Sequence, residues 1–361
     1  MLDLAAVNQV LSSLIDPNTG LDFVSSRSAR NVRVDRGDSV SLDVELGYPA
    51  ASQLGLVREM IATALKQAGA AEVQVAVSSK IVPHTVQRGL KVMPNVRNIV
   101  AVYSGKGGVG KSTVAANLAL ALAAEGARVG VLDADIYGPS QPMMLGVSGQ
   151  PESLDGKTME PKESYGIQVN SIGLLVDPDT PMVWRGPMVT NALQQLLMQT
   201  NWKDVDYLVV DMPPGTGDIQ LTLAQQVPVT GAVIVTTPQD IALQDAMKGL
   251  KMFEKVGVPI LGIVENMAVH VCSQCGHAEH IFGSGGAERM SRDYEVEVLG
   301  ALPLDIRIRE QTDSGRPTVV AEPDGPLAVQ YKTIARRVAI KISQSAKDLS
   351  SKMPSIKVSR T

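Results

Sequence analysis

The sequence GKGGVGKST at residues 105–113 decides how this chain folds. An apolar run, residues 98–103, precedes it, and an Ala/Leu-rich segment, residues 114–124, follows it. This is the strand, glycine-rich turn and helix that a phosphate-binding loop requires, because backbone N–H groups and a helix N-terminus then converge on phosphate oxygens. We therefore expect bound ATP to be contacted along the whole loop, by Gly105, Lys106, Gly107, Gly108, Val109, Gly110, Lys111, Ser112 and Thr113.

The two lysines of the loop have different expected roles. Lys111 is placed to reach the β- and γ-phosphates, and the Ser112 hydroxyl is placed to ligate Mg²⁺. Lys106 is an additional cation that a standard loop does not need. It either points to solvent or carries its charge to a nucleotide, including one bound by a facing subunit.

Two apolar strands further along the chain end in carboxylates. Asp133 and Asp135 follow one of them, and alternate residues of an extended segment point the same way, so both are expected to face the phosphates. One would hold the water shell of Mg²⁺ and the other would orient the attacking water. Asp211 ends the second strand, as the Walker B carboxylate does. The Pro-Pro-Gly sequence 213–215 then forces a sharp turn, which is predicted to be a switch beside the γ-phosphate.

The pattern after residue 98 predicts an α/β fold. Short, β-branched, almost wholly apolar segments alternate with helical ones, which is typical of a doubly wound, mainly parallel sheet covered on both faces. Ligands bind such sheets at the carboxyl ends of the strands, where the motifs above all fall. The predicted strands are 99–103, 128–132, 167–172, 207–210, 231–236, 260–264 and 298–302.

The rest of the chain is divided by composition and turn signals. Residues 1–80 are predicted to form a small α/β module, residues 81–97 a linker, residues 98–342 the ATPase domain, and the Ser/Lys-rich residues 343–361 a disordered tail. Within the module the expected elements are a helix, two strands of a hairpin, a second helix and a last strand, at 2–14, 31–35, 39–46, 52–68 and 71–78.

Composition narrows the function classes. The chain has 361 residues, 44% hydrophobic but only 3% aromatic, and a net charge of −4, which predicts no nucleic-acid footprint. No run approaches the roughly 18 apolar residues of a membrane span. The first 15 residues lack the pattern of a secretory signal. With only two cysteines, close together, a reducing cytoplasmic location is expected.

Both cysteines lie in a cluster with histidines. Cys272 and Cys275 share an eleven-residue stretch with His270, His277 and His280. Zinc bound by Cys272, Cys275, His277 and His280 is one interpretation, although His277 follows Cys275 too closely for a relaxed tetrahedron. A redox dithiol is a second, without its usual thioredoxin-like context. The third is a 4Fe–4S cluster, which generally takes four thiolates, so that two chains would share one cluster.

The motifs together resemble those of the Mrp/ApbC-type iron–sulfur cluster carrier ATPases. This family belongs to the deviant Walker A group with MinD, ParA and the nitrogenase iron protein. The strings that match, over about two-thirds of the chain, are GKGGVGKST, DADIYGPS, WRGPM at 184–188, DMPPGTGD, TTPQD at 236–240, ENM at 265–267 and CxxC.

The resemblance implies roles that the residues alone leave open. Lys106 would act across a nucleotide-sandwich dimer, and Asp135 would lie in switch I. Cys272 and Cys275 would be the cluster-bridging pair. Asn266 and Pro303 would contact adenine.

The N-terminal module is similar to one found in iron–sulfur assembly factors. Ile15-Asp16-Pro17 and Gly20-Leu21 match its turn. Many such modules carry a reactive cysteine where this chain has Tyr48-Pro49-Ala50-Ala51, so a cysteine role is excluded here. Protein docking and a purely structural role both remain open.

The expected function is a homodimeric, Mg²⁺-dependent ATPase that carries a labile 4Fe–4S cluster from scaffold proteins to apo-proteins. Lys106, Lys111 and Asp135 would be catalytic, and Ser112, Asp133 and Asp211 would hold Mg²⁺. One alternative is a ParA/MinD-like positioning ATPase, which needs an amphipathic C-terminal helix or a basic DNA patch. The other is a zinc-stabilised binding module with a vestigial ATPase.

Overall fold

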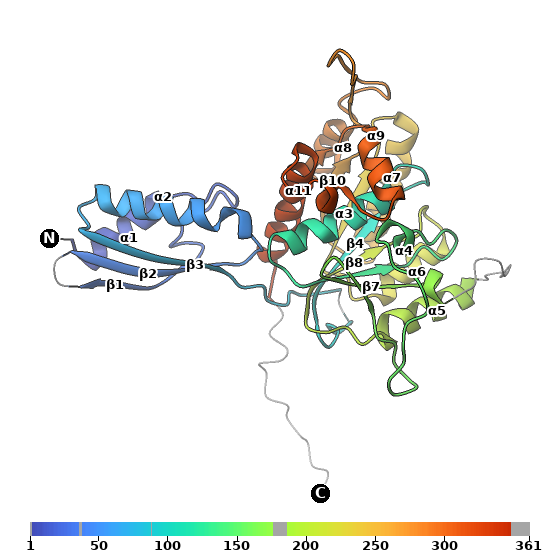
Figure 1. Cartoon of the computed structure of the whole chain (residues 1–361), viewed down its shortest axis with the longest axis horizontal. Coiled ribbons are helices and arrows are strands. Elements are labelled where there is room, and N and C mark those ends of the chain that lie inside the picture. Colours follow the sequence, from blue (N-terminus) through green and yellow to red (C-terminus); the bar gives the residue numbers. More distant parts are fainter. Residues whose placement is uncertain (1, 36–37, 88, 176–185, 348–361) are drawn as a thin grey trace, which may run out of the picture.

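A computed structural model describes residues 2–35, 38–87, 89–175 and 186–347. Figure 1 shows a small N-terminal unit beside a larger unit built on a central sheet. The predicted turn residues Arg36 and Gly37, the motif residues Trp184 and Arg185, and residues 348–361 of the expected tail lie outside the described residues.

The N-terminal unit is a three-stranded sheet with two helices on one face (Figure 1). Strand β2 alternates strictly, with Val40, Leu42, Val44 and Leu46 buried against the helices, as a half-buried strand must. It pairs antiparallel with β1, confirming the predicted hairpin, and parallel with β3. The elements are α1 (Leu4–Ser13), β1 (Ala29–Asp35), β2 (Ser39–Leu46), α2 (Leu54–Gln67) and β3 (Glu72–Ser79).

The larger unit confirms the predicted doubly wound sheet. Within the described residues, its eight strands run in the order β13-β10-β9-β4-β8-β5-β7-β6, with only β6 antiparallel. The sequence prediction missed β6, a three-residue strand at the edge. The strands are β4 (Val96–Tyr103), β5 (Val129–Asp133), β6 (Lys162–Ser164), β7 (Ile167–Ser171), β8 (Val205–Asp211), β9 (Gly231–Thr236), β10 (Ile260–Glu265) and β13 (Val298–Ala301).

Helices cover both faces of this sheet, and the core is correspondingly split in two. In β4, Val100 and Val102 pack toward one face, with α3 (Lys111–Ala124) and α11 (Pro326–Ser343). Ile99, Ala101 and Tyr103 pack toward the other, with α5 (Gly186–Gln199) and α7 (Asp240–Lys255). Burial on both faces is why these strands are continuously apolar. The remaining helices are α4 (Gln141–Met144), α6 (Asp218–Gln226), α8 (Gly286–Tyr294), α9 (Ile306–Asp313) and α10 (Thr318–Ala321).

A buried carboxylate joins the two units. Glu125, which follows α3, is 1% exposed and accepts hydrogen bonds from the Ser52 hydroxyl at 2.7 Å and the Arg336 guanidinium at 2.6 Å. Its backbone carbonyl also accepts from the Ala51 N–H at 3.0 Å. The N-terminal unit therefore contacts the far end of the helix that begins at the phosphate loop.

The segment expected to be a linker, residues 81–97, packs against the larger unit. His84 is buried, the Thr85 N–H donates to the Ala346 carbonyl at 2.9 Å, and the Gln87 amide donates to the Ala224 carbonyl at 2.7 Å. Strand β4 already begins at Val96. At the start of the expected tail, Ser343 ends α11. The backbone of Lys347 forms an isolated antiparallel β-bridge with that of His84. Among the described residues, no helix is both long enough and apolar enough to cross a bilayer.

Candidate nucleotide and metal site

The phosphate loop connects the end of β4 to the start of α3, and its glycines are needed for its shape. Gly108 and Gly110 have φ values of +83° and +82°, a region that side chains rarely adopt. A Cβ on Gly105 would lie 2.2 Å from the Asp245 carbonyl carbon, because the loop packs directly on α7. The phosphate loop thus packs against a helix that is distant from it in sequence.

Asn266, one residue after β10, also supports the loop. Its amide Nδ2 donates to the Val109 carbonyl at 2.9 Å, and a Cβ on Gly110 would lie 2.2 Å from the same nitrogen. The side chain is buried. Pro303 follows β13 at the same sheet edge and is partly exposed. Adenine contacts by Asn266 and Pro303 remain predictions, whereas the bond to the loop is a feature that sequence reasoning missed.

Lys111 lies at the centre of the site. It is 6% exposed, and its ammonium forms an ion pair with the Asp211 carboxylate at the end of β8. The same nitrogen lies 3.5 Å from Asp135 Oδ2 and 3.2 Å from Ser112 Oγ. The structure thus brings together, around one ammonium, groups from the ends of two parallel strands and from the helix N-terminus.

Lys106 is separate from this ion-pair network. It is half-buried, and it forms no ion pair within the part of the chain that the structure describes. The Ser104 hydroxyl donates to its backbone carbonyl at 2.9 Å. The lysine ammonium therefore has no carboxylate in its own chain's described residues to compete with a phosphate.

The two aspartates after β5 are in different environments. Asp133 is fully buried and accepts from the backbone N–H groups of Asp135, Ser140 and Gln141 at 3.0–3.1 Å, and from the Ser171 hydroxyl at 3.1 Å. Burial and the Asp211 carboxylate raise the pKa of Asp133 to about 7. It does not line the phosphate cavity and instead holds the loop 135–141 in place; Mg²⁺ ligation by Asp133 remains a prediction.

Asp135, in contrast, lines the cavity. Burial raises the pKa of Asp135, and the Lys111 ammonium opposes that effect. Its carboxylate is therefore placed beside the phosphate loop and electrostatically tied to Lys111, which is compatible with the role of orienting water.

Gln141, the first residue of α4, is a functional candidate that sequence reasoning missed. It is fully buried, and its Nε2 donates to Asp211 Oδ2 at 2.9 Å and to the Ser112 carbonyl at 3.0 Å. The available signal was its place directly after DADIYGPS. The neighbouring Ser140 hydroxyl is buried, lines the cavity and has no partner among the described residues.

The turn after β8 is bonded to the phosphate loop. The Gly215 N–H donates to the Ser104 carbonyl at 3.0 Å, and the Tyr103 hydroxyl donates to the Gly215 carbonyl at 2.8 Å. Gly215 has a φ of +96°, which accounts for the glycine after the two prolines. Between this turn and the loop lies a cavity of about 220 Å³, which Pro214 helps to line.

The cysteines lie on a separate hairpin. Strands β11 (His270–Val271) and β12 (Ala278–Glu279) pair antiparallel, and the Cys272 N–H donates to the His277 carbonyl at 2.9 Å. Backbone N–H groups of Gln274 and Cys275 donate toward the Cys272 sulfur and lower the pKa of its thiol. Cys275 is exposed and Cys272 partly so, and both are free. The hairpin presents two neighbouring thiols at the surface.

Two of the three nearby histidines bond to backbone instead of gathering around the thiols. His270 Nδ1 lies 3.1 Å from the Leu304 carbonyl, and His280 Nδ1 lies 2.7 Å from the Ala268 carbonyl. In residues 2–35, 38–87, 89–175 and 186–347, no three His, Cys, Asp or Glu side chains are grouped to hold a metal ion. One chain therefore does not assemble the four-ligand zinc site considered from the sequence.

The fold and this constellation define a P-loop NTPase whose phosphate loop contains the additional early lysine. Comparisons with known proteins agree. Residues 95–339 match the family described as NUBPL iron-transfer P-loop NTPase, and residues 4–78 match a family described as iron–sulfur cluster assembly protein. The chain belongs to the NUBPL iron-transfer P-loop NTPase family.

Three relatives illustrate the match. An iron–sulfur cluster carrier protein of Pseudomonas fragi is 61% identical over 269 residues, covering 74% of this chain and 94% of that protein. An iron–sulfur cluster carrier protein of Haemophilus influenzae is 49% identical over 338 residues, covering 93% of this chain and 91% of that protein. The structure of a nucleotide-binding protein from Archaeoglobus fulgidus, in complex with ADP and with cobalt found in it, is 38% identical at a TM-score of 0.57, covering 65% and 91%.

Proposed function

We propose that this protein is an ATP-hydrolysing carrier that binds a labile 4Fe–4S cluster between two copies of the chain and transfers it to apo-proteins. The observation that carries the proposal is the surface hairpin of a P-loop NTPase in an iron-transfer family, with two free thiols and, among the described residues, no third metal ligand beside them. Two such hairpins, related by a two-fold axis, supply the four thiolates that a cubane cluster takes.

The cluster is the cargo in this proposal. Backbone N–H groups at Cys272 stabilise the thiolate, which is the form that binds iron. Cys275 is exposed, so the cluster would lie at a surface that an acceptor's thiolates can reach. Free thiols of this kind suit a reducing compartment such as the cytoplasm. The donors would be cluster scaffold proteins, and the acceptors apo iron–sulfur proteins.

The residues around the 220 Å³ cavity fit a magnesium nucleotide. Lys111 would exchange its bond to Asp211 for one to the β- and γ-phosphates, leaving Ser112 and Asp211 for Mg²⁺, which stabilises the phosphate charge when bound. The buried Ser140 hydroxyl, without a partner among the described residues, would donate to an oxygen in the cavity. Asp135 would orient the attacking water, and Lys106 would reach the nucleotide of the partner.

Only a few residues separate the phosphate loop from the cysteine hairpin. Asn266 bonds the phosphate loop, and Ala268, two residues later, accepts from His280 at the base of the cysteine hairpin. A shift of the loop on hydrolysis would move the hairpins of the dimer relative to each other. A nucleotide that favours one dimer state thereby favours holding or releasing the cluster.

Two alternatives are less well supported. Relatives that are 61% and 49% identical to this chain are named iron–sulfur cluster carrier proteins, which favours cargo transfer over a positioning ATPase. The absence of a third metal ligand among the described residues argues against a zinc-stabilised module.

The test is anaerobic reconstitution with iron and sulfide, with iron content and oligomeric mass measured on the same sample. About two irons per chain in a dimer are expected when two chains share one cubane cluster. Cys275→Ala should abolish iron binding and leave ATP binding unchanged, whereas His277→Ala is the matched control and should retain the cluster. One zinc per monomer and no stable iron would overturn the proposal.

A further inference from the structure

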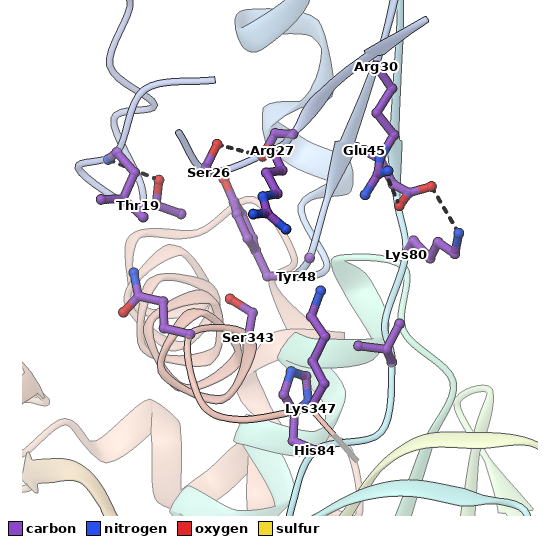
Figure 2. A pocket seen from close by; sticks show the side chains of 15 residues that line it. Thr19, Ser26, Arg27, Arg30, Glu45, Tyr48, Lys80, His84, Ser343 and Lys347 are labelled. Carbon is purple, nitrogen blue, oxygen red and sulfur yellow. Dashed lines mark hydrogen bonds and ion pairs between the residues drawn. The ribbon is translucent and has the colours of Figure 1, made fainter. Parts of the chain in front are cut away.

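A second, larger cavity lies between the two units. It has a volume of about 550 Å³, and none of its lining residues belongs to the phosphate loop. Its walls come from the N-terminal unit, from the segment leading to β4, and from the end of α11, as Figure 2 shows. Cavities of about 300–1,000 Å³ between two units are a common setting for small-molecule sites.

The charge of this cavity is opposite to that of the protein. The chain carries a net charge of −4, yet four of the lining side chains are cations and one is an anion. The anion, Glu45, lies 3.4 Å from Arg30 and 3.1 Å from Lys80, so these three neutralise one another in part.

The other two cations, Arg27 and Lys347, have no carboxylate partner among the described residues. Neither forms an ion pair within the part of the chain that the structure describes. In Figure 2 the Arg27 guanidinium points down and the Lys347 ammonium points up, toward each other across the cavity. Two like charges that face each other repel, and an anion between them would offset this repulsion because it attracts both cations. Arg27 also has a φ of +57°, which is uncommon for an arginine.

A buried histidine on the wall gives a second, independent indication. His84 is 1% exposed and lies beside Lys347 (Figure 2). The Asn98 amide nitrogen donates to the Val82 and Asp206 carbonyls at 3.1 and 3.2 Å, so the Asn98 oxygen is what faces His84 Nδ1 at 3.0 Å. That oxygen only accepts, so Nδ1 carries the proton.

The other ring nitrogen, Nε2, is therefore a bare acceptor. Burial lowers the pKa of His84 and so favours the neutral ring, although the Asn98 oxygen and the backbone carbonyls of Val82 and Ser343 oppose this effect. Nε2 has no hydrogen-bond partner among the described residues, and a buried polar atom of this kind calls for an explanation. A hydrogen-bond donor on a ligand would satisfy Nε2.

We propose that this cavity binds a small oxyanion that also carries a hydroxyl, such as hydrogen phosphate or a hydroxycarboxylate. Its charged oxygens lie between Arg27 and Lys347, and its hydroxyl donates to His84 Nε2. Because Arg27 belongs to the N-terminal unit and Lys347 follows α11, the bound anion holds the N-terminal unit against the ATPase unit. This site is independent of the cluster and of the ATP site.

The first measurement is calorimetric titration of the full chain with inorganic phosphate, citrate or sulfate at constant ionic strength. ADP is present at saturation so that it occupies the phosphate loop, and Mg²⁺ is omitted because citrate would chelate it. Comparing phosphate with citrate shows whether the bound anion is a hydrogen phosphate or a hydroxycarboxylate. Sulfate has the charge of phosphate but no hydroxyl at neutral pH, so it is expected to bind about 10-fold more weakly than whichever of the two binds.

Variants then locate the site. Arg27→Gln and Lys347→Ala should each weaken anion binding about 10- to 100-fold, as expected for the loss of a charged hydrogen bond. The control is Arg33→Gln, because Arg33 is an exposed arginine of β1 that does not line the cavity. Lys347→Glu should abolish binding and raise the melting temperature without anion, because the new carboxylate faces Arg27.

Three results would overturn the inference. They are the absence of saturable heat with both phosphate and citrate, affinities that do not change in Arg27→Gln and Lys347→Glu, and equal affinity for sulfate and phosphate. Retained circular dichroism in each variant shows that a lost affinity does not come from misfolding.

Discussion

The buried ion pair between Glu125 and Arg336 should contribute strongly to stability, and Glu125→Ala tests this. Glu125 is 1% exposed, Arg336 is 13% exposed at its side chain, and Ser52 shares the carboxylate. Removing one partner of a buried pair costs about 3–5 kcal/mol, because the remaining charge stays buried without compensation. The exposure of Arg336 places this case at the low end.

One opposing effect reduces the value further. Glu125 directly follows α3, where a carboxylate is unfavourable beside the helix C-terminus by about 0.3–1 kcal/mol. We therefore expect Glu125→Ala to lower the free energy of unfolding by about 2–3 kcal/mol. Glu125→Gln keeps an oxygen that accepts from Ser52 and removes the unfavourable charge, so we expect about half that loss.

The assay is urea unfolding followed by the fluorescence of buried Trp202, in a Trp184→Phe background. The matched control is Glu254→Ala, an exposed glutamate of α7 without an ion pair among the described residues, which should change stability by no more than about 0.5 kcal/mol. A loss below about 1 kcal/mol for Glu125→Ala would refute the reasoning, because it would show that Arg336 finds water or another partner at little cost.

Four further predictions concern the two sites. Lys111→Ala should weaken ATP binding about 30- to 150-fold and abolish nucleotide-dependent cluster release, while iron content after reconstitution stays unchanged; normal cluster transfer by this variant would make the ATPase incidental. Cys272, whose thiol pKa is lowered, should react with iodoacetamide at a lower pH than a cysteine in a model peptide, and an ordinary pH profile would contradict the backbone bonds to its sulfur. Gln141→Ala should reduce the rate of phosphate release about 10-fold with a smaller change in KM, because Asp211 and the Ser112 carbonyl lose a shared donor. Because its pKa is raised to about 7, Asp133 is largely protonated below that pH, and the Mg²⁺ that we propose for the site would favour the carboxylate. MgADP binding should therefore release up to about one proton near pH 6 and none near pH 8.5; calorimetry in buffers of different ionisation enthalpy measures this, and an equal release by Asp133→Asn would show another source.

Much of the fold was predictable from the sequence because it depends on local patterns. The seven predicted strands all exist, since buried parallel strands must be apolar along their whole length. Strand β6 was missed because the sequence Lys162–Ser164 is polar and pairs only at the edge of the sheet. The β11–β12 hairpin was missed because two-residue strands leave no periodic pattern.

The packing of the segment 81–97 could not be predicted for a related reason. Its mixed polarity and prolines are typical of a linker, but its polar side chains are buried by partners elsewhere in the chain. Gln87 bonds carbonyls at Ala224 and Val227, and His84 bonds Asn98. A buried polar residue is indistinguishable from an exposed one until its hydrogen-bond partner is known.

The sequence by itself determined the class of the protein and the position of its nucleotide site. A phosphate loop is contiguous, its glycines are required by its own backbone, and the carboxyl ends of parallel strands must meet at one edge of the sheet. Only the tertiary structure decided that Gln141 bonds Asp211, that Asn266 supports the phosphate loop, and that Arg27 faces Lys347. These pairs join residues 70, 157 and about 320 positions apart. No local pattern encodes such a pairing, because it arises from how the packed helices and sheets bring distant side chains within hydrogen-bonding or electrostatic range.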